Sequence, residues 1–257
     1  MTLIESIILG LLEGITEFLP ISSTGHLILL QNAMGIADDE FSKTFTITIQ
    51  LGAILAIVML YAERLMKAPR LIAKIAVAFI PTAVIGLTLY KVIKGYLLGN
   101  VMIVAWALAI GGVLMIAFEL LRGKEISAAH DSIEDLPYWK AAVVGVAQSM
   151  AMIPGVSRSG ATIIGGMLLG MSREAIVEFS FLLAIPTMLG ATAYDLFKTY
   201  DQLSWDNTGL LVSGFASAFV AAYITAPALL RFIKRHSFIP FGIYRILLAL
   251  VVAAVLI

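Results

Sequence analysis

The chain has 257 residues, of which 60% are hydrophobic and 13% are charged, and 17 basic and 17 acidic side chains give it a net charge of zero. A typical soluble domain is about 45–50% apolar and about 25% charged, so a soluble globule of this size could not hide so much apolar surface. The low charge excludes a disordered chain, and the lack of a basic excess excludes nucleic acid as a partner. The composition therefore predicts an integral membrane protein that contacts membrane lipids.

Six apolar stretches are long enough to cross a bilayer, because a transmembrane helix needs about 17–25 residues. In chain order they are residues 45–62, 71–90, 99–121, 176–198, 209–230 and 238–257.

Two further apolar regions, residues 3–36 and 139–170, are interrupted by polar turns. Each predicts two half-length helices, because a break at membrane depth is tolerated only inside the protein or beside a water-filled cavity. We therefore expect an all-α polytopic membrane protein with about six transmembrane helices and two re-entrant broken-helix hairpins. Residues 1–257 would form a single integral membrane domain.

The basic residues are concentrated on one side of this predicted topology. Residues 63–74, 122–140 and 231–235, together with Arg173, hold 11 of the 17 Lys and Arg residues. The positive-inside rule places these segments in the cytoplasm. Both chain termini are then outside, the first hairpin enters from outside, and the second enters from inside.

The two broken regions also resemble each other at a spacing of 135 residues. The matched positions are Gly10 with Gly145, Glu13 with Gln148, Ser22 with Ser157, Thr24 with Ser159 and Gly25 with Gly160. Opposite entry of two similar hairpins predicts an inverted-topology repeat, with a site near the midplane where the repeats meet. The repeats would cover about residues 1–121 and 136–257, although chance similarity between Gly/Ser-rich turns is a competing explanation.

Two carboxylates interrupt the first apolar region. Glu13 and Glu17 are four residues apart, so they share one face of a helix. Carboxylates at that depth are costly and are functional by default. The alternative is a structural role, with the carboxyl groups protonated or paired with an arginine such as Arg245.

A polar turn follows this pair. Pro20 ends the first half-helix, and Ser22 or Ser23 suits the N-cap of the next one, whose free N–H groups form an anion site. Ser22, Ser23 and Thr24 add hydroxyl donors to this site. Gly25 allows a ligand to approach the backbone closely, and His26 can transfer a proton. Capping of a helix break is the alternative reading.

The second hairpin repeats this design with a cation. Pro154 and Gly155 break the helix, and Ser157 and Ser159 flank Arg158, whose planar fork suits phosphate oxygens. If the hairpin tips meet, the site favours phosphate or pyrophosphate, with a divalent cation between the anion and the carboxylates. Oxygen ligands without cysteine favour Mg²⁺ or Ca²⁺ at Glu13 and Glu17. The alternative for Arg158 is a salt bridge to one of these carboxylates without a ligand.

These motifs resemble those of bacterial undecaprenyl-pyrophosphate phosphatases, the bacitracin-resistance type. The matching segments are Glu13-x-x-x-Glu17, Glu17-Phe-Leu-Pro-Ile-Ser-Ser-Thr-Gly-His26, Pro154-Gly-x-Ser157-Arg158-Ser159-x-x-Thr162, Glu178–Pro186 and Ser237–Arg245. The resemblance implies removal of the terminal phosphate from a C55 isoprenoid pyrophosphate, which recycles the lipid carrier for peptidoglycan synthesis. It also implies location in the bacterial cytoplasmic membrane, dependence on a divalent cation, a phosphate-binding role for Thr162, and assembly into a homodimer.

The sequence allows alternatives for the attacking group, for the function and for the partner of Arg245. The attacking group is Ser23 activated by Glu17 or His26, His26 itself, or water activated by Glu17, and we favour Ser23. A polyprenyl-phosphate transporter or flippase would use the same anion site, and a membrane scaffold would leave the buried charges unexplained. Arg245, inside the last apolar stretch, requires a partner, and we expect a structural ion pair with Glu119, Glu178 or Asp195.

Overall fold

The computed structural model describes the chain except residues 38, 98–99, 123–131, 200–206, 234–235 and 257. The described residues form ten α-helices, a short π-helix at Ile93–Leu97 and a 3-10 turn at Met150–Met152. The predicted all-α class is confirmed. The basic segments 122–140 and 231–235 lie partly outside the described residues.

Six long helices cover the six predicted stretches. They are α3 (Glu40–Lys67), α4 (Pro69–Val92), α5 (Val101–Arg122), α8 (Arg173–Thr199), α9 (Thr208–Ile233) and α10 (Ile239–Leu256). All six are long and apolar enough to cross a membrane, so the chain is a multi-pass membrane protein. Some run several residues past the apolar stretch because caps set helix ends. At α3, for example, the Asp39 carboxylate accepts a 2.8 Å hydrogen bond from the Ser42 N–H.

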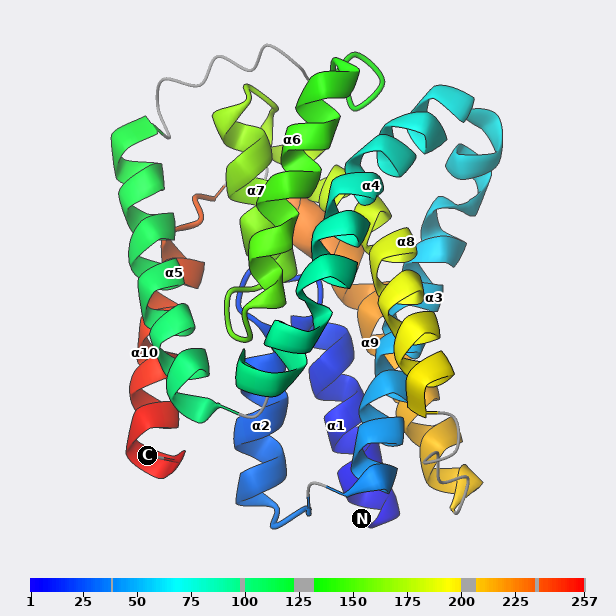
Figure 1. Ribbon diagram of the computed structural model, residues 1–257, viewed down its shortest axis with the longest axis vertical. Coiled ribbons are helices and arrows are strands. Elements are labelled where there is room, and N and C mark those ends of the chain that lie inside the picture. Colours follow the sequence, from blue (N-terminus) through cyan, green and yellow to red (C-terminus); the bar gives the residue numbers. More distant parts are fainter. Residues whose placement is uncertain (38, 98–99, 123–131, 200–206, 234–235, 257) are drawn as a thin grey trace.

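Four short helices make up the two broken regions. They are α1 (Leu3–Thr16), α2 (Ser23–Ala33), α6 (Tyr138–Ser149) and α7 (Arg158–Leu168). Figure 1 shows α1 and α2 side by side in the lower half and α6 and α7 in the upper half, with their turns meeting near the middle. The two chain ends lie at the same end of the molecule. The turns of two hairpins from opposite ends are thereby brought together.

Each hairpin packs on a long helix from the other half of the sequence. Helix α1 lies against α9, and α6 lies against α4. A Cβ at Gly10 would collide with the carbonyl of Gly214, and a Cβ at Gly145 with the carbonyl of Ala78. Glycine therefore permits close backbone approach at matching points of the two hairpins.

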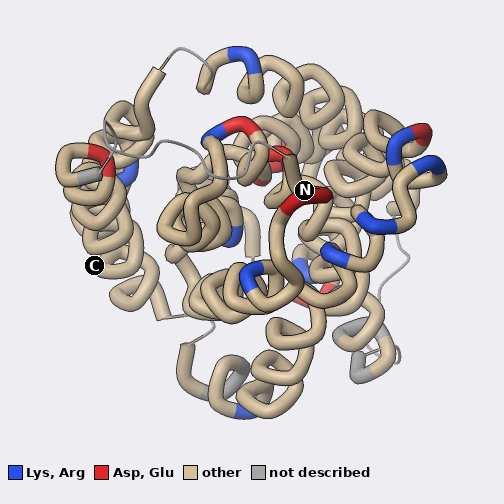
Figure 2. Tube along the Cα trace, turned by 90° about the horizontal axis from the view of Figure 1, so that it is seen from above, with Lys and Arg blue, Asp and Glu red and all other residues tan. Residues whose placement is uncertain are grey.

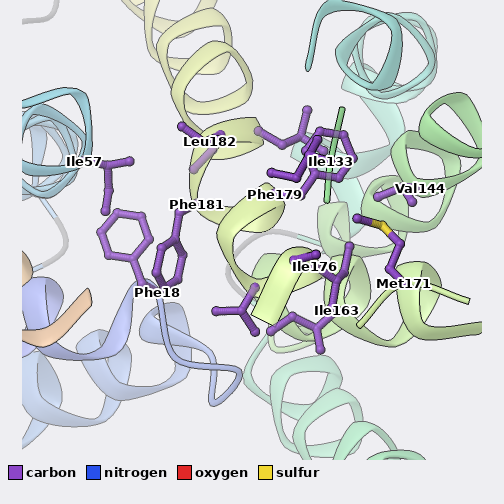
Figure 3. Packing of buried hydrophobic residues seen from close by; sticks show 14 of the residues in the cluster. Phe18, Ile57, Ile133, Val144, Ile163, Met171, Ile176, Phe179, Phe181 and Leu182 are labelled. Atoms are coloured by element: carbon purple, nitrogen blue, oxygen red, sulfur yellow. The ribbon is translucent and has the colours of Figure 1, made fainter. Parts of the chain in front are cut away.

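The apolar core lies around the second hairpin and α8. Figure 3 shows Phe18, from the first hairpin, beside Phe181 of α8 and near Ile57 of α3. The Phe18 and Phe181 rings meet edge to face with centroids 5.4 Å apart. Phe18 thereby anchors the first turn in the core. Figure 2, viewed along the helices, shows how few positions of the trace are charged, as a lipid-facing exterior requires.

Candidate active site

The two hairpin turns share an uncommon backbone conformation. Ser22 and Ser157 precede α2 and α7, and their φ angles are +70° and +74°. Few residues other than glycine adopt this left-handed region. At Ser157 the hydroxyl accepts a hydrogen bond from the Gly160 N–H at 3.2 Å, whereas the Ser22 hydroxyl caps nothing. The two turns therefore share a backbone conformation, but only the second is stabilised by a capping hydrogen bond to its serine side chain.

A short chain of contacts joins the two turns. The Ser23 hydroxyl donates a 2.5 Å hydrogen bond to Oε2 of Glu17, and Arg158 Nη2 lies 3.0 Å from Oε1 of the same carboxylate. All three side chains are largely buried. Arg158 also donates to the Ser180 carbonyl at 2.7 Å, and its Nε–H has no partner in the described part of the chain. The Ser23 hydroxyl, the Glu17 carboxylate and the Arg158 guanidinium thus lie in one row, and the buried Arg158 Nε–H remains as a donor for a ligand.

Glu13 lies one helical turn before Glu17 and is fully buried. Neither of its carboxylate oxygens has a hydrogen-bond partner among the residues that the structure describes. An unpaired buried carboxyl is costly, so this position fits either a bound cation or a shared proton. The described residues contain no group of three or more His, Cys, Asp or Glu side chains that could hold a metal. A cation here would therefore need oxygens from water or from a ligand besides these two carboxylates.

Glu17, Ser23 and Arg158 line a cleft of about 230 Å³, whereas the fully buried Glu13 is not among its lining residues. Its walls are Glu17, Ser22, Ser23, Thr24, Ile47, Gln50, Ala151, Pro154, Gly155, Ser157, Arg158, Met188, Ala191 and Thr192. Gln50 on α3 and Thr192 on α8 were not predicted from the sequence. The signal that singled out Glu13 and Glu17, a polar side chain inside an apolar stretch, would have found both.

Three predicted phosphate ligands lie behind the cleft wall instead of on it. Ser159 is fully buried and donates to the Leu19 carbonyl at 2.7 Å, which ties the second turn to the first. The Thr162 hydroxyl donates to the Arg158 carbonyl at 2.8 Å. Gly25 packs against Leu108 of α5. These residues shape the site without lining it.

His26 is also absent from the cleft lining. Its Nδ1 lies 2.7 Å from the Ser22 carbonyl, and its Nε2 lies 2.8 Å from the Tyr244 hydroxyl. Both ring nitrogens are therefore occupied by partners that do not include Glu17 or Ser23.

Arg245 of α10 is 1% exposed and lies beside both turns. The expected ion pair is wrong, because its guanidinium donates to five backbone carbonyls. These belong to Pro20, Gly155 and Val156 in the turns and to Ala107 and Leu108 in α5, at 2.8–3.5 Å.

Two of the expected carboxylates have other partners. Glu119 pairs with Arg173, and Glu178 pairs with Arg64. The side chain of Asp195 lies outside the described part of the chain. Backbone carbonyls of the two turns and of α5 thus take the role that we expected of a carboxylate.

Comparison with known proteins identifies the family of the chain. A relative from Sulfurihydrogenibium sp., named undecaprenyl-diphosphatase, is 51% identical over 97% of this chain and 98% of its own length. A relative with the same name from Aquifex aeolicus is 49% identical over 99% of this chain and 98% of its own length. Another, from Thermus thermophilus, is 48% identical over 97% of this chain and 95% of its own length. A family model described as bacitracin resistance protein BacA matches residues 6–251. The chain therefore belongs to the BacA bacitracin resistance family.

Proposed function

We propose that this protein is an undecaprenyl-diphosphatase. It hydrolyses undecaprenyl pyrophosphate to undecaprenyl phosphate and inorganic phosphate, and so recycles the lipid carrier for cell-wall synthesis. The observation that carries this proposal is the row of Ser23, Glu17 and Arg158 across the two turns. The names of relatives that match almost the whole chain support the same substrate.

In this mechanism the Ser23 oxygen attacks the terminal phosphorus of the pyrophosphate. Its proton passes to Oε2 of Glu17, which already accepts the hydrogen bond at 2.5 Å. The bond from that phosphorus to the bridging oxygen breaks, and the lipid phosphate leaves with the electron pair. Water then hydrolyses the phosphoserine and releases inorganic phosphate. Arg158 and the backbone N–H groups at the start of α2 and α7 stabilise the charge on the phosphoryl oxygens.

A divalent cation, Mg²⁺ or Ca²⁺, is part of the proposal. Glu13 and Glu17 would hold it, since both are hard oxygen donors and the oxygens of Glu13 are unpaired. When bound, such an ion neutralises charge on the phosphate oxygens.

The membrane arrangement completes the proposal. We place the protein in the bacterial cytoplasmic membrane as a homodimer, with both termini outside and the hairpins re-entering from opposite sides. Residues 1–121 and 136–257 would form an inverted repeat. The matching φ angles of Ser22 and Ser157 support this, as does the packing of each hairpin on a helix of the other half.

The purified protein in detergent is expected to release phosphate from a C55 pyrophosphate without any ion gradient. Ser23→Ala should lower turnover by about 10²-fold or more, because the nucleophile is lost. Acid quenching of wild type with labelled substrate should trap an acid-stable phosphoenzyme that Ser23→Ala lacks. Ser217→Ala on α9, whose hydroxyl donates only to carbonyls of its own helix, is the matched control.

Three outcomes would contradict this assignment. Normal turnover in Ser23→Ala would exclude serine attack, and an acid-labile phosphoenzyme would indicate His26. Lipid binding and transfer between vesicles without phosphate release would indicate a carrier instead of an enzyme.

Removal of divalent cations with a chelator should abolish turnover, and Mg²⁺ or Ca²⁺ should restore it. Glu13→Gln should raise the cation concentration needed for half-maximal rate by about tenfold or more, since one charged ligand is lost. A titration of initial rate against free cation measures this. Full turnover in excess chelator would disprove the metal requirement.

A further inference from the structure

The peptide before Ser23 is held in a strained conformation. Ser22 has φ +70° and ψ +93°, and its hydroxyl makes no capping hydrogen bond. Such a conformation costs about 1–3 kcal/mol for a residue other than glycine and persists only where its surroundings enforce it. Because Ser23 is the next residue, the orientation of this peptide sets the direction of its hydroxyl.

The support for this peptide comes from His26. The Ser22 carbonyl can only accept, so the proton of the 2.7 Å hydrogen bond lies on His26 Nδ1. In a neutral imidazole the other nitrogen is then an acceptor, and the Tyr244 hydroxyl lies 2.8 Å from Nε2 and donates to it. The two rings are nearly parallel, with an interplanar angle of 7°. Tyr244 thereby favours the one neutral tautomer that can hold Ser22.

The neighbouring residue of α10 acts on the same turn. Arg245 donates to the Pro20 carbonyl at 3.3 Å, two residues before Ser22. Arg245 therefore holds the start of the segment that leads into Ser23 directly, and Tyr244 supports the end of that segment through His26.

We propose that Tyr244 and His26 are positioning residues that act in series, with Tyr244 setting the tautomer of His26 and His26 holding the Ser22 carbonyl. Neither residue lines the cleft, so neither touches the reacting atoms. This inference rests on the proposed function, and it replaces the chemical role that the sequence indicated for His26.

Tyr244→Phe removes one hydroxyl and keeps the ring. It is expected to lower kcat by about threefold to tenfold with KM within twofold, the effect of one lost hydrogen bond on a positioned group. In ¹⁵N spectra of histidine-labelled protein, His26 should change from Nδ1–H only to a mixture of tautomers. His26→Gln assigns its signal among the three histidines of the chain. Tyr223→Phe is the matched control, because Tyr223 of α9 is 45% exposed and Tyr244 is 44% exposed.

Substitution of His26 separates positioning from chemistry. Asparagine keeps an N–H donor near the place of Nδ1, so His26→Asn should retain at least about tenfold more activity than His26→Ala. Adding Tyr244→Phe to His26→Ala should have no further effect, since the two residues act in series.

Several results would overturn the proposal. An unchanged tautomer in Tyr244→Phe would do so, whether or not the protein hydrolyses the lipid. Equal inactivity of His26→Asn and His26→Ala would assign His26 to the chemistry, and additive effects in the double variant would show independent roles. Failure of the proposed function itself would appear instead as absent phosphate release in wild type with the tautomer intact.

Discussion

Replacement of Arg158 by alanine should lower kcat/KM by roughly 10³-fold or more while the protein stays folded, as expected for an arginine that stabilises a transferring phosphoryl group. Among the described residues that line the cleft, Arg158 is the one cation. Its removal also leaves the Glu17 carboxylate without its ion-pair partner at 3.0 Å. Steady-state phosphate release in detergent measures the loss.

Arg158→Lys provides the finer test of this role. Lysine keeps the charge but has no planar fork, so it cannot contact Glu17, the Ser180 carbonyl and a phosphate together. We expect activity between those of the alanine variant and wild type. Arg70→Ala, at an exposed position near the start of α4, serves as the control. Near-normal hydrolysis in purified Arg158→Ala would disprove the site.

Replacement of Arg245 by methionine should destabilise the protein by more than about 3 kcal/mol, because several buried carbonyls lose their donor and each costs about 1–3 kcal/mol. Methionine fills similar space, so the lost donors dominate the effect. Thermal unfolding in detergent should show a lower Tm, and activity should fall with it.

Arg245→Lys separates stability from alignment of the two turns. Three donors replace five, so the lysine variant should fold and yet lose kcat, because Pro20 in the first turn and Gly155 in the second no longer share one partner. Arg231→Met, exposed near the end of α9, controls for loss of a charge. A wild-type Tm in Arg245→Met would show that the carbonyls find other partners and that Arg245 does not hold the turns.

The six long helices were predictable because the membrane imposes a minimum length and composition on any span. Both helix breaks were predictable because proline stands there beside a run of polar residues, whereas Pro81, Pro186 and Pro227, in mainly apolar surroundings, lie inside α4, α8 and α9. Glu17, Ser23 and Arg158 could be named because polar groups inside an apolar stretch are rare and costly.

The hydrogen-bond partners of Arg245 and His26 depended on the tertiary structure. A side chain's type follows from the sequence, but its partners depend on how helices from distant parts of the chain cross. Sequence alone therefore indicated a carboxylate partner for Arg245 and chemistry for His26, whereas packing of α10 against both turns gives Arg245 five carbonyls and gives His26 the carbonyl of Ser22. The sequence by itself determined the membrane class, the helices and the polar residues that we propose to react. Only the packing of the two hairpins with α3, α8 and α10 decided which groups face the cleft and which bind backbone carbonyls, because hydrogen bonds form between neighbours in space.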